Sequence, residues 1–548
     1  MAWLRQALAR PGAAVILVTT GFLIVATSWA LASPIGTATD DDYHLPSIWC
    51  ATGPERGICE TVSTSGDSAQ LVSVPRQLVF RCFVSRYPPE VLSPRCLSAI
   101  DGQFARTGGV RGLNGRDTSA TEGSLTYGPY FYTMARILVT TDVEASILRI
   151  RLLNAGIAAA MLAAALTIAS VPIRRALSWS WALALVPLGY FYISSSNPSS
   201  WTIIGMGTLW AFLLTWLAEP NWRSPRALVA LTGVLAACAL VGPTRRDGWF
   251  YVLATLIACL LLTGRVRAEI LTRWLLTLLG AVVIAVRIVA PSYNYGLGLV
   301  QGSALLQANG AAPGTSSAES NGGLTGMLVA TMREAMALPK SLWSVLGGNM
   351  RGENYTAYGL NEIHLPVLVP ILMCIPLVVL LAFGWRWHPR PKVLAVLSIL
   401  GAFILSTLTH KMLMPAGFAI QPRHLVPLML VGVALSLLGP RALELPAKAA
   451  AMCGLSIMLA GTVALVFTQA RYTVGGWQWS RTTEHWWWSS LVAGPSWNIL
   501  LSLTGLGLLT LGSVLLSLPP AVGTRTDSWD SPISASASGA GRSGPRTE

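Results

Sequence analysis

Three adjacent carboxylates and a nearby histidine form the part of the chain best suited to chemistry. They lie in the run Asp40-Asp41-Asp42-Tyr43-His44, which follows the first apolar stretch. Carboxylates this close repel one another, and a membrane surface adds desolvation, so at least one is expected to take up a proton more readily than usual. That property suits a general base. The alternative interpretation is a solvated acidic turn, or the N-cap of a helix starting near Tyr43.

A polar turn precedes a later apolar stretch. The run Ser194-Ser195-Ser196-Asn197-Pro198-Ser199-Ser200-Trp201 leads into that stretch. Free backbone N–H groups and hydroxyls at a helix start are able to receive a phosphate or a sugar, which makes Asn197 a candidate substrate-binding residue. The alternative is a plain turn with an Asn-Pro helix breaker.

Arginines also lie at the ends of two other apolar stretches. Arg245, Arg246 and Asp247 follow one stretch, and Arg423 precedes another. Guanidinium groups here are candidates for pairing with a phosphate or with the acidic cluster. A local ion pair with Asp247 is the alternative for the first two arginines, and anchoring to lipid headgroups is the alternative for Arg423.

Four cysteines fall between the first two apolar stretches. Cys50, Cys59, Cys82 and Cys96 allow three pairings into two disulfides in an oxidising compartment. Proximity along the chain favours Cys50 with Cys59 and Cys82 with Cys96. A zinc site is the alternative, but the segment has no CxxC motif.

The composition indicates that these residues are positioned by membrane-spanning helices. Charged residues make up only 11% of the 548 residues, hydrophobic residues make up 53%, and the mean hydropathy is +0.55. A soluble domain carries roughly 25% charged residues, so these values exclude a soluble enzyme, a disordered chain and a disulfide-rich miniprotein. The net charge of +14 is attributed to membrane topology and not to a nucleic-acid partner. Because the chain has no Walker motif, nucleotide chemistry is not expected.

About twelve stretches are long and apolar enough to cross a bilayer, for which about 20 residues suffice. The sequence predicts an all-α, multi-pass membrane domain over residues 1–517. Its expected spans lie near 13–32, 152–171, 177–195, 201–218, 227–242, 248–264, 274–291, 365–384, 392–409, 424–439, 449–468 and 496–517.

The distribution of Lys and Arg predicts the orientation. Seventeen of them fall on the side of the N-terminus, against six in the short loops of the other side. Since positive residues resist translocation, both termini are expected in the cytoplasm and the domain in the plasma membrane. Residues 33–151 and 292–364 then form two large extracytoplasmic loops, and the polar tail 518–548 is expected to be disordered. A cleavable signal peptide is the alternative for the first span.

The succession of these motifs resembles the DUF2142 family of bacterial membrane proteins, which we group with the GT-C superfamily of membrane glycosyltransferases. The resemblance covers about residues 10–440. It rests on the order of Asp40, Asp41 and His44, then Tyr127-Gly128-Pro129-Tyr130-Phe131-Tyr132, Asn197-Pro198, Arg245 to Asp247, and Arg423-His424.

The resemblance implies a GT-C-like fold that transfers a sugar from a polyprenyl-phosphate donor to an acceptor in the cell envelope. It makes Asp40 or Asp41 the base and gives His44 an orienting role. Six further residues are implied to bind substrate, with the arginines holding the donor phosphate: Asp42, Asn197, Arg245, Arg246, Asp247 and Arg423.

Three points stay open at this level. The chain has Asp41 where the family often has Glu, and Asp42 where Pro is common, so the base is ambiguous by one residue. Carboxylates also suit Mg²⁺ or Mn²⁺, which leaves a divalent cation as an alternative. A transporter or flippase of lipid-linked sugars and a non-catalytic membrane scaffold are the competing functions.

Overall fold

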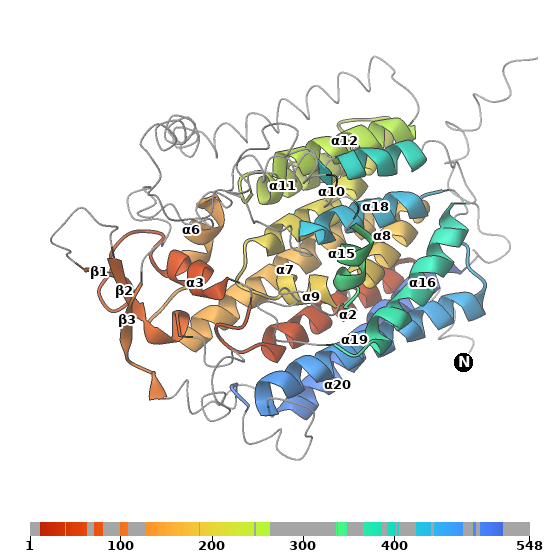
Figure 1. Ribbon diagram of the computed structural model, residues 1–548. Coiled ribbons are helices and arrows are strands. Elements are labelled where there is room, and N and C mark those ends of the chain that lie inside the picture. Colours follow the sequence, from red (N-terminus) through yellow and green to blue (C-terminus); the bar gives the residue numbers. More distant parts are fainter. Residues whose placement is uncertain are drawn as a thin grey trace, which may run out of the picture.

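Apolar stretches of the sequence form helices in the computed structural model of the protein (Figure 1). The structure describes residues 11–38, 40–62, 71–80, 99–107, 128–185, 187–245, 248–263, 332, 336, 338–347, 365–385, 392–401, 403–404, 424–439, 443–474, 486–488 and 494–518. Within these ranges, five helices are long and apolar enough to cross a membrane. They are α2 (Pro11–Ala32), α7 (Val143–Ile168), α10 (Ser199–Ala218), α19 (Ala447–Val474) and α20 (Pro495–Ser517).

Shorter helices pack among these five. They are α8 (Val171–Ala184), α9 (Leu188–Ile193), α11 (Pro225–Val241), α12 (Gly248–Thr263), α15 (Leu338–Val345), α16 (Leu368–Gly384), Lys392–Gly401 and α18 (Val426–Leu437). The chain is therefore a helical membrane protein with several candidate spans. The total of twelve stays a prediction, because the expected span 274–291, most of the loop 292–364 and the tail beyond residue 518 lie outside the described residues.

Two boundaries differ from the sequence-based expectation. The stretch 177–195 is not one helix, because α8 ends at Ala184 and α9 begins only after Pro187. Proline lacks the N–H that a continuous helix would need and clashes with the preceding turn. Helix α7 begins at Val143 and not near residue 152, since the Asp142 side chain caps it by accepting from the N–H of Ala145 at 2.9 Å.

The first and last helices pack against each other along a seam of small residues. Ser28 and Asn498 exchange two side chain to backbone hydrogen bonds, each 2.9 Å long. About two helical turns further along, a Cβ added to Gly21 would lie 2.6 Å from the carbonyl oxygen of Gly505. The pairing of position 28 with 498 and of 21 with 505 makes α2 and α20 antiparallel. Small residues let the two backbones approach closely, as in many membrane helix pairs.

A small sheet and two short helices gather at one end of the helical bundle (Figure 1, left). The helices are α3 (Asp41–Trp49) and α6 (Tyr130–Arg136), and the antiparallel sheet has the order β1 (Glu60–Val62), β2 (Leu71–Pro75) and β3 (Phe104–Thr107). In β2 the buried Val72 and Val74 alternate with the less buried Ser73, which is the period of a half-buried strand. We call this the sheet end of the bundle.

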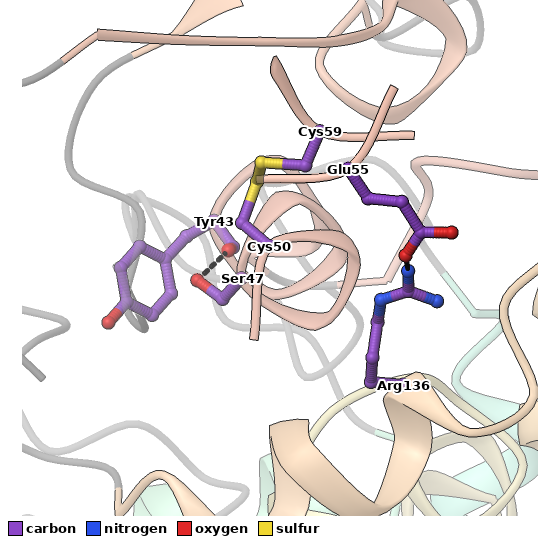
Figure 2. Close-up of a disulfide and its surroundings, with 6 residues drawn as sticks. All are labelled: Tyr43, Ser47, Cys50, Glu55, Cys59 and Arg136. Carbon is purple, nitrogen blue, oxygen red and sulfur yellow. Dashed lines mark hydrogen bonds and ion pairs between the residues drawn. A yellow bond between two sulfur atoms is a disulfide. The ribbon is translucent and has the colours of Figure 1, made fainter. Parts of the chain in front are cut away.

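A disulfide and an ion pair join the two short helices (Figure 2). The disulfide links Cys50, directly after α3, to Cys59, which is the pairing that chain proximity favours. The loop that it closes carries Glu55, whose carboxylate pairs with Arg136 at the end of α6. The far ends of α3 and α6 are thereby held together. The other two cysteines, Cys82 and Cys96, lie outside the described residues.

Removing the disulfide is expected to destabilise the sheet end. The bridge spans a sequence separation of 9 residues, and the chain-entropy relation assigns about 3 kcal/mol of unfolding free energy to a loop of this size. Thermal unfolding of the Cys50→Ser/Cys59→Ser double variant measures the loss. Cys374→Ser is the control, because that cysteine carries a free thiol. An unfolding temperature equal to that of the control would contradict the prediction.

Candidate functional site

The three aspartates at the sheet end lie in three different environments. Asp40 is half-buried, Asp41 is fully buried and Asp42 is exposed. Asp40 has φ 61° and ψ 21°, and within the described ranges no other non-glycine residue has a positive φ. Such a conformation is uncommon outside glycine, and Asp and Asn adopt it more readily than most residues. The cluster is therefore a shaped turn whose carboxylates are not equivalent.

Helix α3 starts from this turn. The N–H groups of Tyr43 and His44 donate to the Asp40 carbonyl at 2.9 Å and 2.8 Å, which begins the helix. Oδ2 of Asp41 accepts from the N–H of Ala38 at 3.1 Å and closes the turn from the other side. Asp42 lies in the first helical turn, where a negative charge is favourable next to the helix dipole.

His44 contacts a residue of the aromatic motif. Its Nδ1 lies 2.9 Å from the hydroxyl of Tyr132 on α6, and the two rings stack with centroids 5.9 Å apart. Both side chains are buried. A hydrogen bond to Nδ1 fixes the ring orientation and the role of the other nitrogen. The contact therefore ties the Asp-rich turn to the segment 128–132.

The polar turn before α10 joins the same assembly. The ring of Trp201 packs edge-on against Phe131, with centroids 5.1 Å apart. Its Nε1 donates to the Asn154 side chain at 3.0 Å, and Asn154 donates in turn to the Ser195 carbonyl at 2.8 Å. Helices α6, α7 and α10 are thus connected at the sheet end through buried polar and aromatic contacts.

Asn197 shapes the start of α10. Its Oδ1 accepts from the N–H of Ser199 at 2.9 Å, and its carbonyl accepts from the N–H of Ser200 at 3.0 Å. These bonds occupy N–H groups that were candidates for binding a phosphate. In its described contacts, Asn197 fits the alternative interpretation of the motif, a turn that starts a helix.

Arg245 is the described member of the arginine pair. It lies in the segment that joins α11 to α12, and its side chain is buried, with 2% exposed. The N–H of Gly128 donates to the neighbouring Thr244 carbonyl at 3.0 Å, and any Cβ at position 128 would collide with the carbonyl of Pro243. Only glycine fits this approach. The segment 128–132 therefore contacts the arginine segment at one end and His44 at the other.

Several sequence-based candidates cannot be placed. Arg246, Asp247 and Arg423 lie outside the described residues, while the adjacent His424 is buried at the start of α18. Among the residues that the structure describes, no group of three or more His, Cys, Asp and Glu side chains has the arrangement of a metal site. A divalent cation stays a prediction.

The structure adds three residues that the sequence-based candidate site did not include. Arg151 of α7 is fully buried and donates to the carbonyls of Ala30, Ser33 and Pro34. Trp487 and Trp488 donate to the carbonyl of Leu31 at 3.1 Å and 2.9 Å. The signal for Arg151 is an arginine in the interior of α7, visible once the helix is known to start at Val143. No pattern in the sequence pairs the tryptophans with α2.

Comparison with known proteins assigns the chain to a family. The DUF2142 family, described as predicted membrane proteins, matches residues 22–431. The match covers the acidic turn, the aromatic motif and the arginine segment, and the chain belongs to this family. No curated protein and no solved structure matches the chain. The family description agrees with the apolar helices and names no reaction.

Proposed function

We propose that the protein is a GT-C-type glycosyltransferase. It moves a sugar from a polyprenyl-phosphate donor in the bilayer to a glycan, lipid or protein acceptor of the cell envelope. The observation that carries the proposal is the convergence of an acidic turn, an aromatic motif and an arginine segment at one end of a membrane bundle. The links are the contacts from His44 to Tyr132 and from Gly128 to Thr244.

The two kinds of charged group match the two needs of sugar transfer. A base must remove the proton of the acceptor hydroxyl, and a cation must stabilise the departing phosphate. Asp40 supplies the base, because this residue is half-buried, whereas Asp41 is fully buried and its carboxylate closes the turn at the N–H of Ala38. Of the three candidate arginines, Arg245 is the one that the structure describes, and its guanidinium suits the phosphate.

The reaction then balances as a single displacement. The Asp40 carboxylate accepts the hydroxyl proton while the hydroxyl oxygen attacks the anomeric carbon of the donor sugar. The bond from that carbon to the phosphate oxygen breaks, and polyprenyl phosphate leaves with the electron pair. Arg245 offsets the negative charge that grows on the phosphate. His44, fixed by Tyr132, orients the turn that carries the base.

The same proposal places the sheet end on the outer face of the plasma membrane, with both termini in the cytoplasm. The excess of Lys and Arg on the opposite side of the helices supports this orientation. The Cys50–Cys59 disulfide at the sheet end also supports it, because disulfides persist in oxidising compartments.

A transfer assay with the purified full-length protein tests the proposal. The protein in nanodiscs is incubated with a polyprenyl-phosphate-linked radioactive hexose and with an envelope fraction from a strain that lacks the protein. We expect label to move from the lipid phase into the acceptor fraction, at a rate that rises with protein concentration. If the label stays on the lipid but crosses the bilayer of proteoliposomes, the protein is a transporter and the proposal fails.

A further inference from the structure

The end of helix α2 is held from two directions. The last carbonyls of a helix have no partner within the helix and must find one elsewhere. Here Arg151 of α7 donates to the carbonyl of Ala30 at 3.0 Å, and Trp487 and Trp488 donate to that of Leu31. Elements far apart in the chain thus fix the point from which the acidic turn departs.

Arg151 also holds the acidic turn itself. Beyond the helix, its guanidinium donates to the carbonyl of Ser33 and, at 3.1 Å, to that of Pro34. The Thr37 hydroxyl donates to the same Pro34 carbonyl at 2.8 Å, and Asp41 closes the turn at Ala38. One guanidinium therefore spans the helix end and the start of the turn.

Asp41 and Arg151 form a buried charge partnership. Both side chains are fully buried, and the Asp41 carboxylate acts electrostatically on the Arg151 guanidinium. An isolated charge in such a place is very unfavourable, whereas a partnered one with hydrogen bonds is tolerated. The opposite charges of the two groups favour the burial of both, while Arg151 holds the start of the turn at Ser33 and Pro34 and Asp41 closes it at Ala38.

We infer that Arg151 is a positioning residue of the proposed active site. Together with Asp41 it holds the turn 33–41 in place, so that of the two aspartates Asp40 and Asp41 only Asp40 presents its carboxylate to a substrate. The inference rests on the proposed function for its catalytic meaning. The structural part of the inference does not depend on that function: Arg151 keeps Asp41 buried, whereas Asp40 stays half-buried. Arginine suits this role because its planar fork reaches several carbonyl oxygens at once.

Carboxyl footprinting of the full-length protein in nanodiscs tests the clamp without any sugar donor. A water-soluble carbodiimide with an amine modifies accessible carboxylates, and mass spectrometry of the peptide that contains residues 40–42 reports each aspartate separately. In the wild type we expect modification of Asp40 and Asp42, with Asp41 at background. In Arg151→Gln we expect the modification of Asp41 to rise to the level of Asp42.

Two further variants separate positioning from a purely structural effect. Arg151→Lys keeps the charge but not the fork, so Asp41 should be modified to an intermediate degree. Arg149→Gln removes an exposed arginine of the same helix and should leave the footprint unchanged. If Asp41 stays at background in both folded Arg151 variants, the clamp is refuted. Should Arg151→Gln fail to fold, Arg151→Lys alone decides in the same way.

The transfer assay adds the catalytic readout. Where the wild type transfers sugar, Arg151→Gln should lower kcat and leave the KM for the lipid donor unchanged, because the donor phosphate is held elsewhere. An unchanged kcat would refute the positioning role. A wild type that transfers no sugar, combined with an altered footprint in Arg151→Gln, would refute the proposed function and retain the clamp.

Discussion

Replacing Asp40 by asparagine is expected to lower the rate of sugar transfer about 10²- to 10⁴-fold, the usual contribution of a positioned general base. Asparagine has nearly the same shape as aspartate but cannot accept the hydroxyl proton at neutral pH. It is also one of the few residues that tolerate the left-handed conformation found at position 40, where φ is 61°. The substitution therefore removes the base and retains the turn.

The fold should be unaffected by this change. The bonds that start α3 at Asp40 come from its backbone carbonyl, which asparagine keeps. Steady-state transfer by Asp40→Asn and thermal unfolding in nanodiscs are the two measurements, and a lost rate at an unchanged unfolding temperature is the expected pair of results.

Two comparison variants define what the result means. Glu60→Gln neutralises an exposed carboxylate of the same end of the molecule and should transfer at the wild-type rate, since its acceptor role toward the N–H of Gly57 survives in the amide. Asp41→Asn leaves Arg151 buried opposite a neutral group and should lower the unfolding temperature. Full turnover in Asp40→Asn would remove Asp40 from the mechanism. A rate loss confined to a stably folded Asp41→Asn would assign the base to Asp41.

Hydropathy predicted the helices well because the property that it measures is the one that selects them. Spans expected near 201–218 and 496–517 are observed as Ser199–Ala218 and Pro495–Ser517. A run of apolar side chains in lipid must form its backbone hydrogen bonds internally, so local composition suffices. Boundaries were less predictable where a single side chain sets them, as Asp142 does for α7 and Pro187 does between α8 and α9.

The candidate site was predictable in its residues but not in its contacts. Asp40, His44 and the motif 127–132 stood out by type, yet the hydrogen bond from His44 to Tyr132 joins positions 88 residues apart. Arg151 was passed over because the span was expected to begin near residue 152, which left Arg151 in the preceding loop. Only the structure reveals that its donors are directed at the end of α2. Long-range pairing carries no local signature, so these roles required the fold.

The seam between α2 and α20 is the second place where a small change should have a large effect. Replacing Gly21 by alanine is expected to destabilise the protein by about 1–3 kcal/mol or more, as overpacking of a tight interface does. The new Cβ would meet the backbone of Leu509 and would lie 2.6 Å from the carbonyl oxygen of Gly505. Backbone atoms cannot move aside as a flexible side chain can, so the helices must separate.

The sign of the effect distinguishes this mechanism from ordinary helix propensity. Alanine favours a helix over glycine by up to about 1 kcal/mol, so glycines that touch nothing should become more stable on the same substitution. Gly12 on α2 and Gly507 on α20 have no atom within 4 Å of an added Cβ and provide matched controls. Gly21→Ala and Gly505→Ala should lower the unfolding temperature, whereas Gly12→Ala and Gly507→Ala should raise it or leave it unchanged.

Thermal unfolding in detergent, followed by tryptophan fluorescence, measures all four variants, since the chain has 21 tryptophans. One end of the seam also positions the proposed site. Ser28 and Asn498 join the two helices shortly before Ala30 and Leu31 of α2. Arg151 binds the carbonyl of Ala30, and Trp487 and Trp488 bind that of Leu31. Loosening the seam should therefore lower sugar transfer before it unfolds the protein. Equal stability of Gly21→Ala and Gly12→Ala would show that the two helices do not pack through Gly21 and Gly505, and that this seam does not support the end of α2 from which the acidic turn departs.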